Sequence, residues 1–131
     1  MIRIFIVDRH PLVRQALEDR LNATDDLEII GSTGRYQFAI QRVRILLPDV
    51  ILLEIKTPTG IETLKALRSA SPRSALIVLT SYPDSREEDI ALQNGAVSYV
   101  LKNLNTKALI QEIHHAASHR HRPTSRPFSY L

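Results

Sequence analysis

Short apolar runs alternate with longer amphipathic segments along most of the chain. The runs are rich in Ile, Val and Leu, and the segments between them carry apolar residues every three or four positions. A short continuous apolar run is typical of a strand buried on both faces, whereas the wider spacing is typical of an amphipathic helix. The predicted strands are residues 2–7, 27–33, 50–53, 75–80 and 97–101.

A helix is predicted after each strand, and several residues indicate where these helices begin or end. Pro11 suits the first turn of a helix, and Thr59 with Glu62 has the form of a capping box. Asp84 is expected to cap the fourth helix, and Gly95 is expected at its C-terminus. The last helix is predicted to begin at residue 105 or 106.

The apolar residues of the first two helices indicate which side faces the core. The residues expected to point inward are Leu12, Val13, Ala16, Leu17 and Leu21, then Phe38, Ala39, Ile40, Val43, Leu46 and Leu47.

Five alternations of strand and helix define the fold class. They predict an α/β protein with a flavodoxin-like, doubly wound five-stranded parallel sheet in the order 2-1-3-4-5 and five helices. Residues 1–118 are predicted to form this domain. Residues 119–131 are rich in Arg, His and Pro, and we interpret them as a linker or tail.

Charged or hydroxyl side chains follow four strands that are neighbours in this topology. Asp8 and Arg9 end the first strand, Glu54 the third, Thr80 the fourth and Lys102 the fifth. The carboxyl ends of parallel strands meet at one edge of the sheet, where ligands of such folds bind. The sequence therefore predicts a site at this edge.

The chain resembles the receiver domain of two-component response regulators over residues 2 to about 118. It is most similar to the branch whose receivers precede a LuxR-type helix-turn-helix. The segments that carry the resemblance are IFIVDRHPLVRQAL, PDVILLEI with its following proline, IVLTSY and GAVSYVLKN.

The resemblance implies a role for each polar strand end. Glu54 takes the place of the aspartate that accepts a phosphoryl group from a histidine kinase, and Asp8 with Arg9 takes the place of two acids that hold Mg²⁺. Thr80 and Lys102 match residues that contact the phosphoryl oxygens. The resemblance also implies that the aromatic on the fifth strand, Tyr99, turns inward on activation.

Two of these positions depart from the family pattern. The charges of Asp8 and Glu54 are cancelled by those of Arg9 and Lys102, whereas Mg²⁺ is held through carboxylates in a near-octahedral oxygen shell. Glu54 also extends its carboxylate by one carbon–carbon bond, about 1.5 Å, relative to aspartate. We therefore predict that Mg²⁺ binding is lost, that no cofactor is needed and that Glu54 is not phosphorylated.

Three functions agree with this pattern. The first is a phosphorylation-independent receiver that serves as the regulatory and dimerisation module of a transcriptional regulator. The second is a conventional Mg²⁺-dependent phosphoacceptor, and the third is a stand-alone adaptor for protein interactions. None of them is an enzyme in the usual sense. The expected partners are a second copy of the chain, a sensor kinase or other regulatory protein, and DNA only through a domain outside this chain.

Two roles are possible for Glu54 in the first function. An ion pair with Arg9 or Lys102 is expected for its carboxylate. This pair either holds Thr80, Lys102 and Tyr99 in an active-like arrangement or forms an inert structural cluster.

Composition excludes several other classes. The net charge of +3 is too small to indicate nucleic-acid binding, and the absence of cysteine excludes disulfides. Neither a membrane-spanning run nor a signal peptide is predicted, so we expect a cytoplasmic protein. His115 and His119 lie one helical turn apart and could bind Zn²⁺ or Ni²⁺, although basic residues near a helix C-terminus are favourable without a metal.

Overall fold

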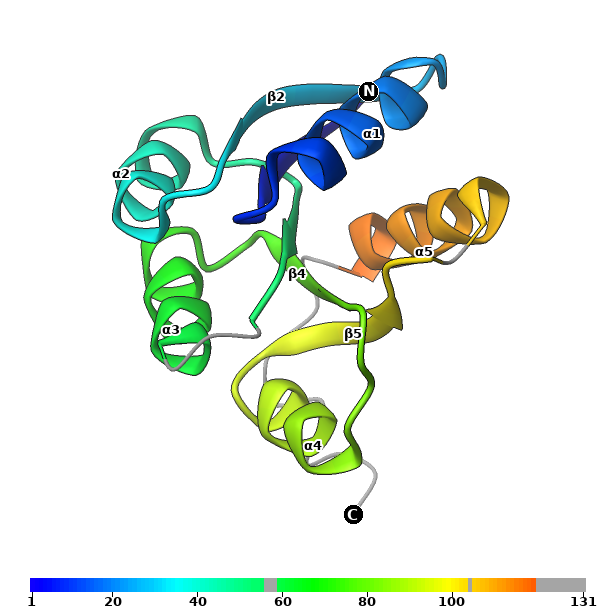
Figure 1. The fold of residues 1–131 in the computed structure, drawn as a ribbon. Helices are drawn as coiled ribbons and strands as arrows, with labels where there is room; N and C mark the ends of the chain where they lie inside the picture. The colour runs from blue at the N-terminus through cyan, green and yellow to red at the C-terminus, as the bar shows by residue number, and fades with distance from the viewer. Residues whose placement is uncertain (56–58, 104, 120–131) are drawn as a thin grey trace.

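A computed structural model describes residues 1–55, 59–103 and 105–119 (Figure 1). Strands and helices alternate in the order predicted from the sequence. The elements are β1 (Ile2–Val7), α1 (Pro11–Asn22), β2 (Leu27–Thr33), α2 (Tyr36–Leu46), β3 (Val50–Leu53), α3 (Gly60–Ala70), β4 (Ala75–Thr80), α4 (Ser85–Gln93), β5 (Ala96–Leu101) and α5 (Thr106–His119).

The five strands form one parallel sheet in the order β2-β1-β3-β4-β5, which confirms the predicted fold class. Helices cover both faces, with α1 and α5 on one side and α2, α3 and α4 on the other (Figure 1). None of the described helices is long and apolar enough to cross a membrane.

The central strands divide their side chains between two cores. In β1, Ile4 and Ile6 join the cluster under α1 and α5, whereas Phe5 and Val7 join the cluster under α2, α3 and α4. The same alternation continues through β3 and β4, because successive strand residues point to opposite faces. Burial on both faces explains why these strands are continuous apolar runs.

The inward side of α1 and α2 is narrower than predicted. Leu12 and Ala16 are exposed, the former by 86 %, and Phe38 and Leu47 are exposed as well. Leu12 and Phe38 each precede a core-facing position by one residue, and one residue turns a helix by about 100°. The prediction that these four residues face the core was wrong.

The predicted helix ends were correct in part. The carboxylate of Asp84 accepts a hydrogen bond from the N–H of Arg86, so Asp84 caps α4 as predicted. Gly95 directly follows the cap residue Asn94 and has a φ of 110°, a conformation that favours glycine. Thr59 precedes α3 but its side chain makes no capping hydrogen bond. Its ψ of 10° is not the extended conformation that a capping box requires.

Candidate functional site

Main-chain hydrogen bonds hold the predicted site residues at the carboxyl edge of the sheet. The N–H of Glu54 donates to the carbonyl of Val7 at 3.0 Å, which places Glu54 beside Asp8. The N–H of Lys102 donates to the carbonyl of Thr80 at 2.8 Å. The sheet therefore brings the ends of β1, β3, β4 and β5 together, as the sequence predicted.

Asp8 lies at the centre of the site and is only 1 % exposed. Its Oδ2 lies 2.7 Å from the Nζ of Lys102, whose side chain is 10 % exposed. This ammonium is the ionic partner of Oδ2, which accepts no hydrogen bond of normal geometry from the described residues. The other oxygen, Oδ1, accepts the main-chain N–H of His10 at 2.9 Å and lies 3.1 Å from its Nδ1.

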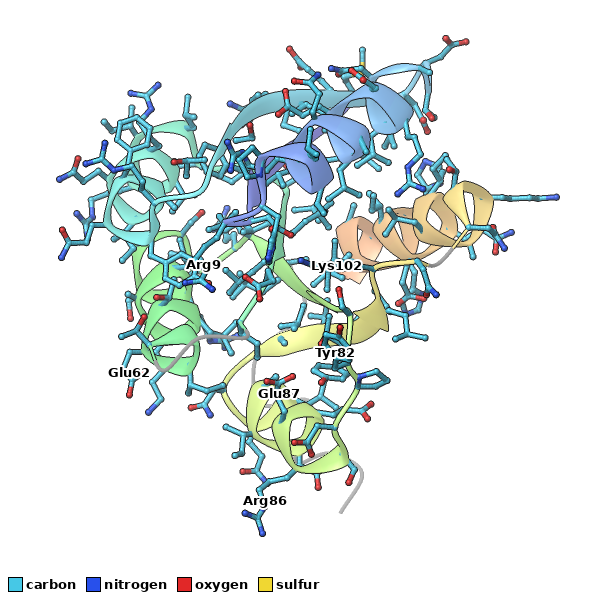
Figure 2. The ribbon with its side chains drawn as sticks, in the orientation of Figure 1. Arg9, Glu62, Tyr82, Arg86, Glu87 and Lys102 are labelled. Carbon is cyan, nitrogen blue, oxygen red and sulfur yellow. The ribbon has the colours of Figure 1, made fainter. Side chains whose placement is uncertain are left out.

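Arg9 does not occupy the site in the way we expected. Its side chain is exposed, and within the described residues it forms no ion pair. In Figure 2, Arg9 lies on the side of α2 and α3, whereas Lys102 lies on the side of α5. The expected ion pair of Glu54 with Arg9 or Lys102 is therefore wrong, because Arg9 extends outward and Lys102 pairs with Asp8.

Glu54 is 2 % exposed and is held partly by a residue of α2. The hydroxyl of Tyr36 donates a 2.8 Å hydrogen bond to the main-chain carbonyl of Glu54 and lies 3.4 Å from its Oε1. This hydrogen bond attaches the N-terminus of α2 to the end of β3. Tyr36 was not predicted as a site residue, because nothing in the local pattern indicates that a helical tyrosine reaches a strand end eighteen residues later.

Thr80 is fully buried, and its hydroxyl is engaged by the loop that follows β4. The Oγ1 of Thr80 accepts a hydrogen bond from the N–H of Tyr82 at 3.2 Å and lies 3.3 Å from its carbonyl oxygen. Tyr82 belongs to this loop and is 75 % exposed (labelled in Figure 2). The hydroxyl of Thr80 is thus positioned by its own loop.

Tyr99 is half-buried and its ring packs against the core under α2, α3 and α4. Its hydroxyl donates a 2.5 Å hydrogen bond to Oε1 of Glu87 and accepts one from the N–H of Asp84 at 3.2 Å. Burial, together with the hydrogen bond to the Glu87 carboxylate, raises the pKa of Tyr99 to about 12, although the Asp84 N–H and the Thr80 hydroxyl oppose the shift. Tyr99 therefore connects β5 to the first turn of α4.

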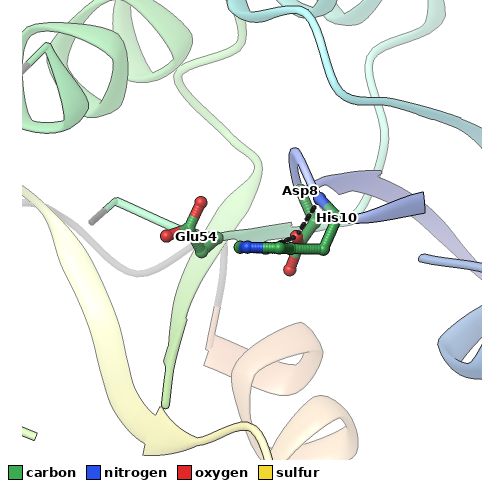
Figure 3. A group of neighbouring side chains, drawn as sticks. All are labelled: Asp8, His10 and Glu54. Atoms are coloured by element: carbon green, nitrogen blue, oxygen red, sulfur yellow. Dashed lines mark hydrogen bonds and ion pairs between the residues drawn. The ribbon is translucent and has the colours of Figure 1, made fainter. Parts of the chain in front are cut away.

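Asp8, His10 and Glu54 form a group of candidate metal ligands (Figure 3). Each contributes one ligand atom, and these atoms lie within 4.8 Å of one another. His10 was not predicted as a site residue, although its position two residues after an aspartate is a signal for a local turn around that carboxylate.

This donor set differs from the carboxylate set that the family pattern implies for Mg²⁺. Mg²⁺ requires a near-octahedral shell of oxygen atoms, whereas one member of this group is an imidazole. The ammonium of Lys102 also occupies one oxygen of Asp8. We therefore derive no step of chemistry through Mg²⁺.

The fold and the carboxyl-edge site define a receiver-like domain, and comparison with known proteins gives its family. The profile of the response regulator receiver domain matches residues 4–114. The chain therefore belongs to the response regulator receiver family, whose members act in two-component systems.

Several curated relatives at this level of similarity are transcriptional regulators, and one is a protein-glutamate methylesterase/protein-glutamine glutaminase of Syntrophomonas wolfei, 31 % identical over 103 residues. The chain is 34 % identical over 115 residues to the DNA-binding transcriptional activator DevR/DosR of Mycobacterium tuberculosis, covering 86 % of this chain and 53 % of the relative. It is 31 % identical over 119 residues to the nitrate/nitrite response regulator protein NarL of Escherichia coli strain K12, covering 88 % and 54 %. The chain thus spans about half the length of the curated relatives it matches.

Solved structures agree with the fold. The response regulator domain of CheB from Thermotoga maritima is 27 % identical, with a TM-score of 0.81 over 90 % of this chain and 97 % of that one. A LuxR-family DNA-binding response regulator from Staphylococcus aureus has the same fold, with a TM-score of 0.81 at 24 % identity over 89 % of this chain and 99 % of that one.

Proposed function

We propose that this chain is an atypical, phosphorylation-independent receiver domain that serves as the regulatory and dimerisation module of a transcriptional response regulator. The observation that carries the proposal is the set of side chains at the carboxyl-edge site. The carboxylates of Asp8 and Glu54 occupy it, Lys102 pairs with the first of them, and Arg9 extends outward where the family has a second acid.

Phosphoryl transfer depends almost entirely on positioning and on charge stabilisation. Glu54 carries its carboxylate about 1.5 Å further than an aspartate would, which misplaces the attacking oxygen. The donor set around it does not suit Mg²⁺. Lys102 would also have to leave a buried carboxylate before it could contact a phosphoryl oxygen.

A domain of this kind acts through binding and not through catalysis. Because the two transcriptional regulators named above are proteins of which this chain covers only about half, we propose that the natural protein continues into a DNA-binding domain. The predicted tail would then form the linker; its first residue, His119, is the last residue of α5, and residues 120–131 lie outside the described part of the chain. The proposed partners of the receiver are a second copy of itself and a sensor kinase or another regulatory protein.

A phosphodonor experiment tests this function. The purified chain is incubated with acetyl phosphate and Mg²⁺, and its intact mass and its assembly state are followed together. A conventional receiver serves as the positive control. We expect no gain of mass and no change in the dimer fraction. A phosphoryl adduct on the native chain would instead identify a conventional Mg²⁺-dependent phosphoacceptor.

A further inference from the structure

The outer side of α2 exposes large apolar side chains next to arginines. Phe38 and Ile45 are both exposed, the latter by 68 %, and they lie on the same side of the helix because seven residues separate them. Arg42 lies between them on this side, and Arg35 precedes Phe38 by three residues. We refer to these four residues, together with Leu47, as the α2 face.

Leu47 extends the α2 face beyond the end of the helix. It occupies the C-cap with φ 49° and ψ 62°, a left-handed conformation that glycine or asparagine adopts more readily than leucine. Its side chain is nevertheless 56 % exposed. A leucine in this conformation contributes little to the isolated domain, whereas it would add apolar area to a contact with another molecule.

The charge of the α2 face is positive and is not neutralised within the domain. Residues 29–48 contain three arginines and no acid. Arg35, Arg42 and Arg44 form no ion pair with any residue that the structure describes. A surface that is both apolar and basic suits a partner surface that is both apolar and acidic.

The helix α4 offers this complementary combination. Leu92 is exposed, and Glu88 and Asp89 precede it by four and three residues, which places the three side chains on the same side of the helix. The two carboxylates form no ion pair with the described part of the chain. We refer to Glu88, Asp89 and Leu92 as the α4 face.

The two faces cannot meet within one molecule. Figure 1 shows α3 between α2 and α4 on the same side of the sheet, and α3 contacts both of them. The α2 face and the α4 face therefore lie on the two outer members of one layer of helices. Only a second copy of the chain can bring an α4 face onto an α2 face.

We propose that copies of the chain associate through these unlike faces, with the α2 face of one copy against the α4 face of the next. This inference deepens the proposed function and rests on its self-association, because it names the surfaces that make the contact. It does not depend on whether the receiver can be phosphorylated.

The charges favour the contact between unlike faces over a symmetric one. Two α2 faces would bring arginines against arginines, and two α4 faces would bring carboxylates against carboxylates. The unlike pair instead places Arg35 and Arg42 opposite Glu88 and Asp89 while the apolar side chains are buried. Such a contact leaves one free face at each end, so assembly does not stop at a two-fold dimer.

Sedimentation velocity of the whole chain over a range of concentrations measures this association. We expect the mean mass to rise with concentration and to exceed that of a dimer at the highest concentrations. The mean mass should fall at high salt, because salt screens the attraction between exposed charges.

Two double variants each block one face. Arg42→Gln with Ile45→Gln removes charge and apolar area from the α2 face, and Glu88→Gln with Leu92→Gln does the same on the α4 face. Glutamine preserves helix propensity. Each variant alone should associate about tenfold or more weakly than the native chain. An equimolar mixture should form one-to-one dimers and nothing larger, because it supplies one intact α2 face and one intact α4 face.

The matched control removes an exposed leucine and an exposed acid from another helix. Leu12→Gln with Asp19→Gln on α1 should leave the association unchanged. Leu47→Asn should weaken association about fivefold without lowering the thermal midpoint, because asparagine tolerates the left-handed conformation. Circular dichroism checks folding, and the single variants Ile45→Gln and Leu92→Gln replace any double variant that does not fold.

The outcomes separate this inference from the proposed function. Dimers formed by either face variant alone, or a mixture that stays monomeric, would overturn the contact between unlike faces and leave the proposed function in place. A native chain that is monomeric at every concentration would overturn both this contact and the proposed dimerisation. A phosphoryl adduct on a chain that associates as described would overturn phosphorylation independence alone.

Discussion

The ammonium of Lys102 lies 2.7 Å from Oδ2 of Asp8, although β3 and β4 lie between their two strands in the sheet. This ion pair therefore bridges the carboxyl edge from β5 to β1. It leaves Glu54 to be positioned from another direction, in part by Tyr36 of α2. The arrangement of the site therefore depends on the pairing of Lys102 with Asp8 and not with Glu54.

Loss of the Lys102 ammonium should strongly destabilise the domain. Lys102→Met leaves the Asp8 carboxylate buried without its counter-charge, and we expect the free energy of unfolding to fall by about 3 kcal/mol. Urea denaturation measures this change. The exposed Lys65 gives the matched control, Lys65→Met, which should change stability by less than about 0.5 kcal/mol.

The double variant Asp8→Asn with Lys102→Met separates loss of the pair from loss of packing. Removing both charges should recover a substantial part of the stability lost in Lys102→Met, because no unpaired ion is left behind. Equal stability of the single and the double variant would show that the ion pair is not the origin of the effect.

Loss of the hydrogen bond from Tyr36 to Glu54 should lower the free energy of unfolding less than loss of the Lys102 ammonium does. Tyr36→Phe removes only the hydroxyl that donates to the Glu54 carbonyl, and we expect a loss of about 1 kcal/mol in thermal or urea unfolding. Tyr82→Phe is the control, since the side chain of Tyr82 is largely exposed. Identical losses in the two variants would contradict a specific role for Tyr36 at the end of β3.

Tyr99 should make stability depend on pH in the alkaline range. Its pKa is raised from 10.0 to about 12 in the folded state, so the unfolded chain loses this proton first as the pH rises. The contribution of Tyr99 is fully present below pH 10 and is lost between pH 10 and about 12. Titration of phenolate absorbance in the native chain and in Tyr99→Phe should reveal one tyrosine that ionises late. If the native chain and Tyr99→Phe show the same late part of the titration curve, the late-ionising group is not Tyr99.

Restoring the family acids should restore a site for Mg²⁺. Arg9→Asp combined with Glu54→Asp adds a carboxylate and shortens another, which supplies the oxygen ligands that Mg²⁺ prefers. We expect Mg²⁺ affinity to rise on the order of tenfold or more, measured by calorimetry. The single variant Arg9→Lys keeps the positive charge and should show no gain. If the double variant binds Mg²⁺ no better than the native chain, the two departures are not what prevents binding.

The sequence by itself determined the fold. The strands are buried on both faces, so they had to be continuous apolar runs, and their alternation with amphipathic helices predicted the order β2-β1-β3-β4-β5. It also determined which strand ends meet, because parallel strands place their carboxyl ends at one edge. The spacing of apolar residues predicted the core-facing side of the helices less reliably. Leu12 and Phe38 lie one position away from a core-facing residue and are exposed.

Only the tertiary structure decided how the charged groups pair. Several ion pairs are possible among the charged residues Asp8, Arg9, Glu54 and Lys102. Side-chain direction and burial determine which of these pairs form. The structure pairs Lys102 with Asp8, leaves Arg9 exposed and places the imidazole of His10 beside Asp8. These contacts join residues that are distant in sequence, or depend on rotamers that the backbone pattern does not specify. For this reason the position of the site could be predicted, whereas its ligand chemistry could not.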